Sequence, residues 1–266
     1  QPSGGNSQAP ANSDAGTQAS APAENVTIRV GATPAPHVQI LEQVVDVLAE
    51  QGITLEIETI NDYNTPNDGV EDGSLDANYF QHITYMNGYN ADNGTHLVSV
   101  GEIHYEPLGL YAGKTDSIDA LPDGAQIAVP NDTTNEARAL LLLEQEGLLT
   151  LAEGAGINAT VLDIVDNPKN LEFVELEAAQ IPTRLADVDM AVINGNYAMG
   201  AGMSIADALA IESSDGTAAT AYANVVAVKE GNENNEAILA LVEALKSDEV
   251  KAYMEETFQG SVVPLF

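Results

Sequence analysis

Residues 26–60 read VTIRVGATPAPHVQILEQVVDVLAEQGITLEIETI, and this stretch decides the fold class. Residues 26–33 alternate apolar and polar side chains and are rich in β-branched types, which predicts a strand. Apolar residues then recur at helical spacing through residues 36–52, and Gly52 ends the predicted helix. Residues 55–60 predict the next strand. A strand, a helix and a second strand in this order indicate an α/β fold in which helices cover a sheet.

The same alternation continues along the rest of the chain. Strand patterns occupy residues 96–113, 125–130, 171–176, 190–194 and 222–229. Helical patterns lie between the strands, and a pair of helical stretches follows at residues 235–258. We therefore expect mostly parallel sheets covered by helices, in two α/β lobes, with ligands bound where loops leave the carboxyl ends of strands.

Local signals predict where two further helices begin. In residues 65–73, Thr65 is the expected N-cap and Pro66 takes the first helical position. Ahead of the helical pattern at residues 135–147, Thr133 and Glu136 have the spacing of a capping box. Both signals place a helix start directly after a predicted strand or loop.

The charge of the chain excludes several classes of partner. Lys and Arg total 8 against 41 Asp and Glu, so the net charge is −33. Such a field repels phosphate backbones and anionic lipid headgroups, which excludes nucleic-acid binding through basic patches. The chain contains no Cys, so disulfides, thiolate zinc sites and a cysteine nucleophile are excluded as well. At 44% hydrophobic residues the chain still has the material for a sizeable core.

The first 25 residues differ in composition from the rest. They consist almost wholly of Gly, Ser, Ala, Pro, Asn and Gln, without an aromatic residue. Such a segment cannot bury enough apolar surface to offset its ordering entropy. We expect residues 1–25 to be a disordered tether that joins the globular part to an upstream segment.

The common sequence motifs of enzymes are mostly absent. The sequence lacks a G-x-S-x-G elbow, a Walker A loop and an H-E-x-x-H pair. Residues 154–159 match G-x-G-x-x-A, but a helix precedes them and a strand follows, the reverse of the order that dinucleotide binding requires. The four His residues show no paired ligand spacing. We predict no catalytic residue, no metal and no cofactor.

Arginine is scarce, and one of the three Arg residues stands out. Arg29 lies in the first strand and Arg184 stands close to Asp187, where a surface ion pair is expected. Arg138 lies near a helix start, where the backbone already favours anions. Two readings stay open for Arg138: a salt bridge with one of the protein's own carboxylates, or a guanidinium that holds a ligand carboxylate.

Several long blocks resemble one known family. They are NDYNTPN (61–67), LDANYFQH (75–82), AVPNDTTNEARALLLL (128–143), NPKNLEFVELEAAQIPTRL (167–185) and AVINGNYA (191–198). Through them the chain resembles the methionine-binding lipoproteins of ABC importers, the MetQ/NlpA-type family, from about residue 26 to residue 266. The resemblance implies a bilobed periplasmic-binding-protein fold, type II-like, with two mixed sheets flanked by helices and a hinge.

The resemblance also implies a division of the chain. Lobe 1 would comprise residues 26–108 and 225–266, and lobe 2 residues 109–224. The implied function is to capture methionine outside the cell, L-methionine first, and to deliver it to a membrane permease with its ATPase. A monomer is implied, with an N-terminal lipid anchor on a Cys upstream of Gln1, so the protein would sit at the outer face of the cell membrane or in the periplasm.

Carried over by position, the implied ligand-binding residues are Tyr63, Phe80, His82, Tyr85, Arg138, Asn194 and Asn224. Their chemistry is coherent with a zwitterion that bears a thioether. The guanidinium would hold the carboxylate, the Asn oxygens would accept from the ammonium, and the aromatic rings would surround the sulfur.

Three alternatives remain at this stage. The same fold would serve for another apolar amino acid or a methionine-containing dipeptide, and residues 211–223 would then reshape the pocket. A transferase on this fold is a weaker alternative, because no nucleophile–base pair is recognisable. A surface adhesin has no motif in its favour.

Overall fold

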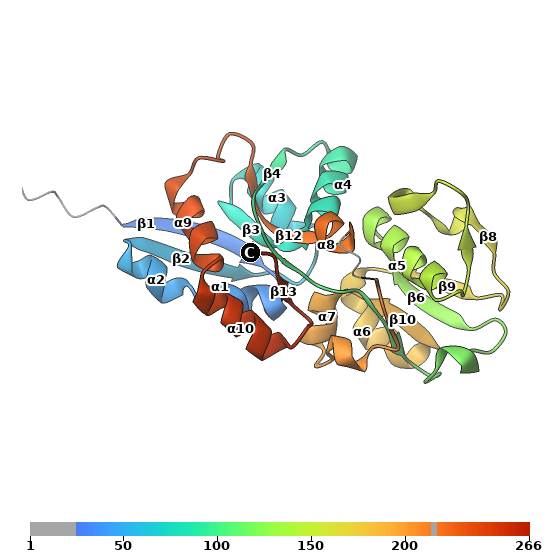
Figure 1. The fold of residues 1–266 in the computed structure, drawn as a ribbon. Helices are drawn as coiled ribbons and strands as arrows, with labels where there is room; N and C mark the ends of the chain where they lie inside the picture. The colour runs from blue at the N-terminus through green and yellow to red at the C-terminus, as the bar shows by residue number, and fades with distance from the viewer. Residues whose placement is uncertain (1–24, 214–216) are drawn as a thin grey trace, which may run out of the picture.

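The computed structural model describes residues 25–213 and 217–266 (Figure 1). The predicted tether, residues 1–25, therefore lies outside the described residues except for Asn25. In the described part, no helix is both long and apolar enough to cross a bilayer.

The first of two large sheets has six strands in the order β13-β4-β12-β3-β1-β2. Its strands are β1 (Val26–Ala32), β2 (Ile53–Thr59), β3 (Ala77–His82), β4 (Leu97–Tyr105), β12 (Ala223–Lys229) and β13 (Val263–Pro264). Strand β1 pairs parallel with β2 and β3, whereas β12 and β13 pair antiparallel. The sheet is therefore mixed.

Helices cover this first sheet. They are η1 (Pro34–Val38), α1 (Gln39–Glu42), α2 (Val45–Glu50), α3 (Thr65–Asp72), α4 (Ile83–Asn93), α9 (Glu236–Leu245) and α10 (Asp248–Phe258). The single helix predicted for residues 36–52 was wrong, because three short pieces take its place. Ala35 has an extended backbone, with φ −135° and ψ 135°, as expected for a residue that precedes a proline. Within residues 36–52, Ile40, Leu41 and Leu48 are still buried and pack in one core cluster, whereas Val47 is exposed.

The second sheet has five strands in the order β11-β5-β10-β6-β9. They are β5 (Gly109–Ala112), β6 (Gln126–Pro130), β9 (Glu172–Leu176), β10 (Met190–Ile193) and β11 (Ala210–Ile211). Strand β6 pairs parallel with β9 and β10, and β5 pairs antiparallel with β10 and β11. The expectation of mostly parallel sheets was thus wrong in part, since both sheets are mixed.

Short elements surround the second sheet. The helices are α5 (Thr133–Gln145), α6 (Ile181–Arg184) and α7 (Gly195–Gly200), while α8 (Thr217–Ala221) contacts β12 of the first sheet. The 3-10 turns are η2 (Ile118–Ala120), η3 (Gly156–Asn158), η4 (Val161–Asp163), η5 (Ala178–Gln180), η6 (Leu185–Asp187) and η7 (Ile205–Asp207). Strands β7 (Thr150–Leu151) and β8 (Ile164–Asp166) form a separate two-stranded ribbon. A cluster that includes Leu110, Ile127, Leu140 and Val192 forms the core.

Both predicted helix caps are shifted by one residue. Helix α3 includes Thr65, and Asn64 is its N-cap, while the Asp62 carboxylate accepts from both backbone N–H groups at 2.8 Å. The capping box on Thr133 was also wrong, because Asp132 caps α5 by accepting from Asn135 N at 3.0 Å. A carboxylate at this end is also favoured by the helix dipole.

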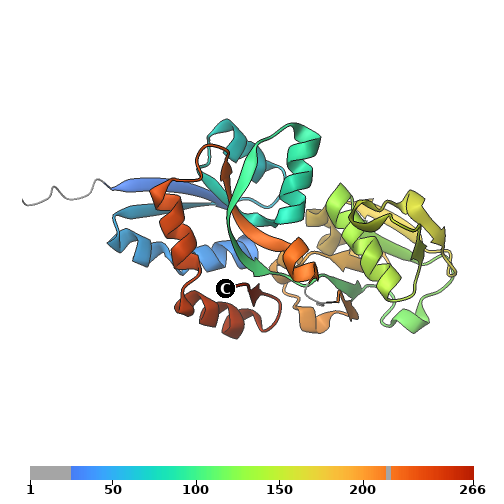
Figure 2. The same cartoon turned by 45° about the horizontal axis from the view of Figure 1, so that its top comes forward.

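Figures 1 and 2 show the two sheets with their helices as two lobes that lie side by side. The chain passes from the first sheet to the second at residues 106–108 and returns between β11 and β12. The exact lobe boundaries at residues 108 and 224 stay a prediction. Hydrogen bonds that join the lobes directly include those from Tyr63 Oη to Asn196 Oδ1, from His82 Nε2 to Asn135 Oδ1, and from Tyr197 Oη to Asn61 O.

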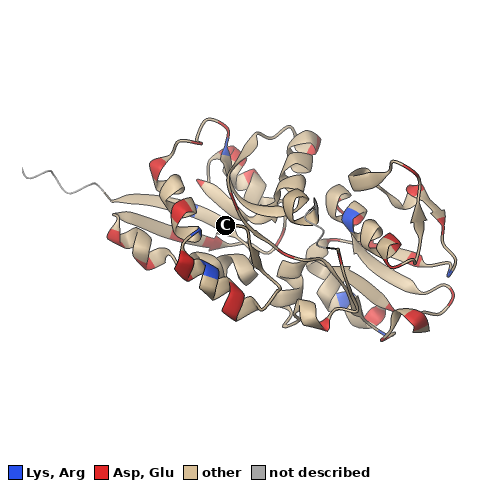
Figure 3. Cartoon of the chain, in the orientation of Figure 1, with Lys and Arg blue, Asp and Glu red and all other residues tan. Residues whose placement is uncertain are grey.

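Acidic residues are spread along both lobes, with few Lys and Arg residues among them (Figure 3). In the described part of the chain, only four Asp, Glu, Lys or Arg residues are buried: Glu106, Glu136, Arg138 and Glu212. The acidic excess is therefore mostly hydrated surface. Of these four residues, Glu106, Arg138 and Glu212 come together where the chain passes between the lobes.

Candidate ligand-binding site

A small cavity, with about 20 Å³ of free space, lies between the lobes. Its lining residues are Tyr63, Phe80, Gln81, His82, Tyr85, Glu106, Asn135, Arg138, Asn194, Gly195, Asn196 and Asn224. The structure thus brings all seven sequence-predicted residues to one cavity.

One wall of the cavity is aromatic. The ring of Tyr63 lies 5.8 Å from that of Phe80 and 5.4 Å from that of Tyr85, centroid to centroid. The hydroxyl of Tyr63 donates to Asn196 Oδ1 at 2.6 Å, and that of Tyr85 donates to the Tyr63 carbonyl at 3.0 Å. Burial raises the pKa of both phenols, so they stay neutral. Their polar tips are already bonded within the protein, which leaves ring surface for an apolar ligand group.

His82 links this wall to the second lobe. Its Nδ1 accepts from Tyr85 N at 2.9 Å at the start of α4, which leaves Nε2 as the donor to Asn135 Oδ1 at 2.8 Å. Burial, together with the charge of Arg138, lowers the pKa of His82 to about 3. The imidazole is therefore neutral, with its tautomer set by these two bonds.

Arg138 is held by a carboxylate that the sequence did not single out. Its Nε donates to Glu212 Oε2 at 2.9 Å, and its Nη2 donates to Glu212 Oε1 and, at 3.0 Å, to the carbonyl of Glu106. The guanidinium also lies 4.0 Å from the ring centroid of Tyr222. Nη1 has no acceptor in the part of the chain that the structure describes. Arg138 thus forms a salt bridge with one of the protein's own carboxylates, and its Nη1 is left for a ligand.

Glu212 is fully paired in return. Besides Arg138 it accepts from Tyr105 Oη at 2.6 Å and from Leu108 N at 3.0 Å. Burial alone would raise the pKa of Glu212, but Arg138 outweighs this and lowers it. The buried pair is therefore ionised and satisfied by hydrogen bonds, as such pairs must be to persist.

Two polar atoms at the cavity are buried without a partner in the described part of the chain: Asn194 Oδ1 and Asn196 Nδ2. One is an acceptor and the other a donor. Leaving such groups unpaired costs about 1–3 kcal/mol each. Asn224, in contrast, is engaged, because its Oδ1 lies 2.8 Å from His37 Nε2. The cavity therefore offers unmet hydrogen bonds of both kinds.

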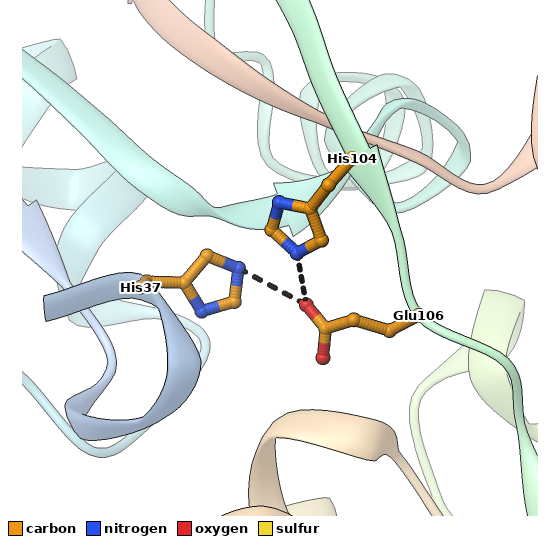
Figure 4. A group of neighbouring side chains, drawn as sticks. All are labelled: His37, His104 and Glu106. Atoms are coloured by element: carbon orange, nitrogen blue, oxygen red, sulfur yellow. Dashed lines mark hydrogen bonds and ion pairs between the residues drawn. The ribbon is translucent and has the colours of Figure 1, made fainter. Parts of the chain in front are cut away.

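Glu106 lines the cavity, and its carboxylate contacts two histidines (Figure 4). Its Oε2 lies 2.7 Å from His104 Nε2 and 3.3 Å from His37 Nε2. The other ring nitrogens bond to hydroxyls, His37 Nδ1 to Thr33 Oγ1 at 2.7 Å and His104 Nδ1 to Tyr79 Oη. Burial would raise the pKa of Glu106, but the two imidazoles outweigh it and lower the pKa to about 2.

This cluster also holds three groups of the kind that ligate metals, which the His spacing in the sequence did not predict. The contacts already account for the arrangement, since His104 Nε2 donates to the carboxylate, His37 Nε2 bonds to Asn224 Oδ1 at 2.8 Å beside it, and each Nδ1 meets a hydroxyl. We therefore interpret it as a hydrogen-bond network around Glu106.

Sequence reasoning missed part of the lining. The missed residues are Gln81, Glu106, Asn135, Gly195, Asn196 and, behind Arg138, Glu212. Asn135 and Asn196 were within reach, because they lie three residues before Arg138 and two after Asn194. Glu106 stands beside the predicted crossing between lobes, which was a usable signal. Glu212 lies 74 residues from its partner and had none.

Comparisons with known proteins agree with this architecture. The chain is 42% identical over 240 residues to the D-methionine-binding lipoprotein MetQ of Salmonella typhimurium, covering 89% of this chain and 87% of the relative. A crystal structure from Ruminococcus gnavus is 55% identical, with a TM-score of 0.89, and the match covers 90% of this chain and 99% of that one. A nutrient-binding protein of Burkholderia cenocepacia, solved bound to methionine, is 43% identical, with a TM-score of 0.84 and coverage of 90% and 100%.

A match to a family model shows which family the chain belongs to. Residues 28–266 match the model described as NlpA lipoprotein, which is nearly the whole globular part. The chain therefore belongs to the NlpA lipoprotein family.

Proposed function

We propose that this chain is the extracytoplasmic substrate-binding protein of an ABC importer and that it binds methionine. The observation that carries the proposal is the cavity, which has an aromatic wall at one side and unpartnered polar atoms at another. Contacts between a thioether and aromatic rings contribute roughly 0.3–1.5 kcal/mol each. The names of its relatives agree: one is called D-methionine-binding, and another was solved with methionine.

The residues divide the ligand between them. The rings of Tyr63, Phe80 and Tyr85 would surround the thioether. Arg138 Nη1 would donate to the carboxylate, with Asn196 Nδ2 as a second donor. Asn194 Oδ1 would accept from the ammonium. His82 and Asn224 would act mainly by holding the cavity together, because their polar atoms already bond to Asn135 and His37.

The chain works as a binding protein and not as an enzyme, as its relatives are substrate-binding proteins. We propose that the two lobes close on the ligand about the segments at residues 107–110 and 222–224, with lobe boundaries near residues 108 and 224. Closure excludes water and so strengthens the contact between Arg138 and the carboxylate. The closed form would be what the permease and its ATPase recognise. A monomer, tethered by a lipid on an upstream Cys at the outer face of the membrane, completes the proposal.

Isothermal titration calorimetry tests the ligand directly. We expect ligand-stripped, refolded protein to bind L- or D-methionine saturably at one site per chain. Mass spectrometry of material released on denaturation would detect another apolar amino acid or a methionine-containing dipeptide in its place. No saturable heat with either methionine enantiomer would exclude methionine as the ligand.

A further inference from the structure

The carboxylate of Glu106 is only half used by the protein. Its Oε2 meets both His37 Nε2 and His104 Nε2, whereas no donor in the described part of the chain reaches Oε1. Glu106 is 6% exposed and lines the cavity. A carboxylate oxygen that lines a cavity without a protein donor is open to a donor from a ligand, and such a charge-assisted hydrogen bond would favour binding there.

The charges around Glu106 define what that donor must be. The Arg138 guanidinium reaches the backbone carbonyl of Glu106 at 3.0 Å, but its ion pair is with Glu212 and not with the Glu106 carboxylate. Among the described residues, no Lys or Arg pairs with Glu106; its ion-pair partners are His37 and His104. The cavity thus contains the Glu106 carboxylate, which no Lys or Arg among the described residues pairs with. Beside it lies Arg138, whose Nη1 has no acceptor in the same part of the chain. That pairing complements a group that carries both charges on adjacent atoms.

We propose that Glu106 binds the α-ammonium group of the ligand through Oε1, and that His37 and His104 are positioning residues that fix this carboxylate. This inference rests on the proposed function and narrows its substrate class. One ammonium has three N–H donors and can serve Glu106 Oε1 and Asn194 Oδ1 together. The ligand carboxylate then faces Arg138 Nη1.

The ligand class follows from the same geometry. An acylated amine has one N–H and no charge, so it cannot replace the ammonium beside a buried carboxylate. The site therefore selects free α-amino acids and rejects N-acylated amino acids and peptides that end in methionine. Of the two alternative ligands considered above, another apolar amino acid remains compatible and a dipeptide with C-terminal methionine does not.

Matched ligands test the proposal by calorimetry. L-Methionine is compared with 4-(methylthio)butanoic acid, which lacks only the amino group, and with N-acetyl-L-methionine. L-Leucine and 4-methylpentanoic acid form a second matched pair. In wild type we expect each amino acid to bind at least about 30-fold more tightly than its des-amino acid, as for loss of a buried charged partner.

Variants locate the effect at Glu106. In Glu106→Gln, affinity for L-methionine should fall at least about 30-fold, while affinity for the des-amino acid should change by less than about 3-fold. Glu102→Gln, on the exposed part of the same strand, is the matched control and should leave both affinities unchanged. In His104→Phe, the preference for the amino acid over its des-amino form should fall, which a purely structural role of the imidazole would not produce.

The outcomes separate the two proposals. If wild type binds an amino acid and its des-amino form equally, or if Glu106→Gln weakens both equally, the role of Glu106 is wrong while ligand binding stands. If leucine binds and methionine does not, the proposed ligand is wrong and the leucine pair still tests Glu106. If no amino acid binds, both proposals fail. Should Glu106→Gln not fold, the wild-type ligand pairs still decide.

Discussion

Glu106 and Glu212 are two buried carboxylates that stand at the two crossings between the lobes, and their partners differ. Glu212 has both oxygens occupied by Arg138, with Tyr105 and Leu108 as further donors. Glu106 has one oxygen held by two histidines and the other without a protein donor. Ionisation does not separate them, because the surroundings lower the pKa of both groups. The difference teaches that a charge matched inside the protein serves the fold, and a charge left half matched serves a ligand.

The largest effect should come from breaking the matched pair. Arg138→Ala leaves Glu212 buried without its cation, so the free energy of unfolding should fall by about 3 kcal/mol. Methionine affinity should fall at least about 100-fold, because the ligand carboxylate also loses its donor. Urea unfolding and calorimetry measure the two losses.

A double variant then separates fold from binding. Arg138→Ala/Glu212→Ala removes both charges, so most of the lost unfolding free energy should return while the affinity should not. Glu106→Gln should be milder for stability, because an amide oxygen still accepts from His104. A double variant as unstable as Arg138→Ala alone would contradict the account of Glu212 as a structural charge.

Acid titration should separate His82, which bridges the lobes, from the two carboxylates. Its pKa is lowered to about 3 in the fold, so the folded state favours the neutral ring. The resulting stability is complete above the unfolded pKa near 6.5 and is lost as the pH falls toward 3. Between pH 6.5 and 4.5 we expect His82 to contribute a loss of about 2 kcal/mol to the free energy of unfolding. Glu106 also lowers the stability as the pH falls, but only between its ordinary pKa of 4.5 and its lowered pKa of about 2.

The variant His82→Gln isolates the first of these windows. In urea melts, the unfolding free energy of wild type relative to this variant should fall by about 2 kcal/mol between pH 6.5 and 4.5, and the part of the acid loss that the carboxylates cause should remain in the variant. An unchanged slope above pH 4.5 would show that another group titrates there.

The smallest effect should come from Glu136, a buried carboxyl that lacks a basic partner among the described residues. Burial and the neighbouring Glu175 raise the pKa of Glu136 to about 8. Stability should therefore fall as the pH rises from the ordinary value toward 8, the opposite sign from Glu106. Glu136→Gln should remove this slope and raise the thermal midpoint at pH 9, with little change at pH 4. A midpoint lowered at pH 9 would contradict the assignment.

Much of the fold was predictable because its signals are local. The alternation in residues 26–60 and the later strand patterns placed most elements correctly. Two kinds of feature were not local. Strand direction depends on where the chain crosses between lobes, so β12 was not assigned as antiparallel. The start of α5 was ambiguous, because Asp132 and Thr133 are adjacent and both are good N-caps.

The site was predictable where residues were rare. Arg138 stood out among 8 basic residues, and the structure places it at the cavity. Scarcity gives no such signal for Glu106 or Glu212 among 41 acidic residues. Only their burial distinguishes them, and burial follows from packing between segments far apart in sequence. The ligand-binding role of the seven residues stays a prediction.

The direct hydrogen bond from Tyr197 to Asn61 joins the lobes just behind the cavity, where the Tyr197 ring packs 4.9 Å from that of Tyr63. In the closure proposed above, this bond would form as the lobes meet and would act as a latch. It tightens the grip on any cargo that allows closure, and it must break before unloading can begin. Residence time and hand-over rate are therefore tuned in part by residues that never meet the cargo, and evolution can adjust delivery there without altering selectivity.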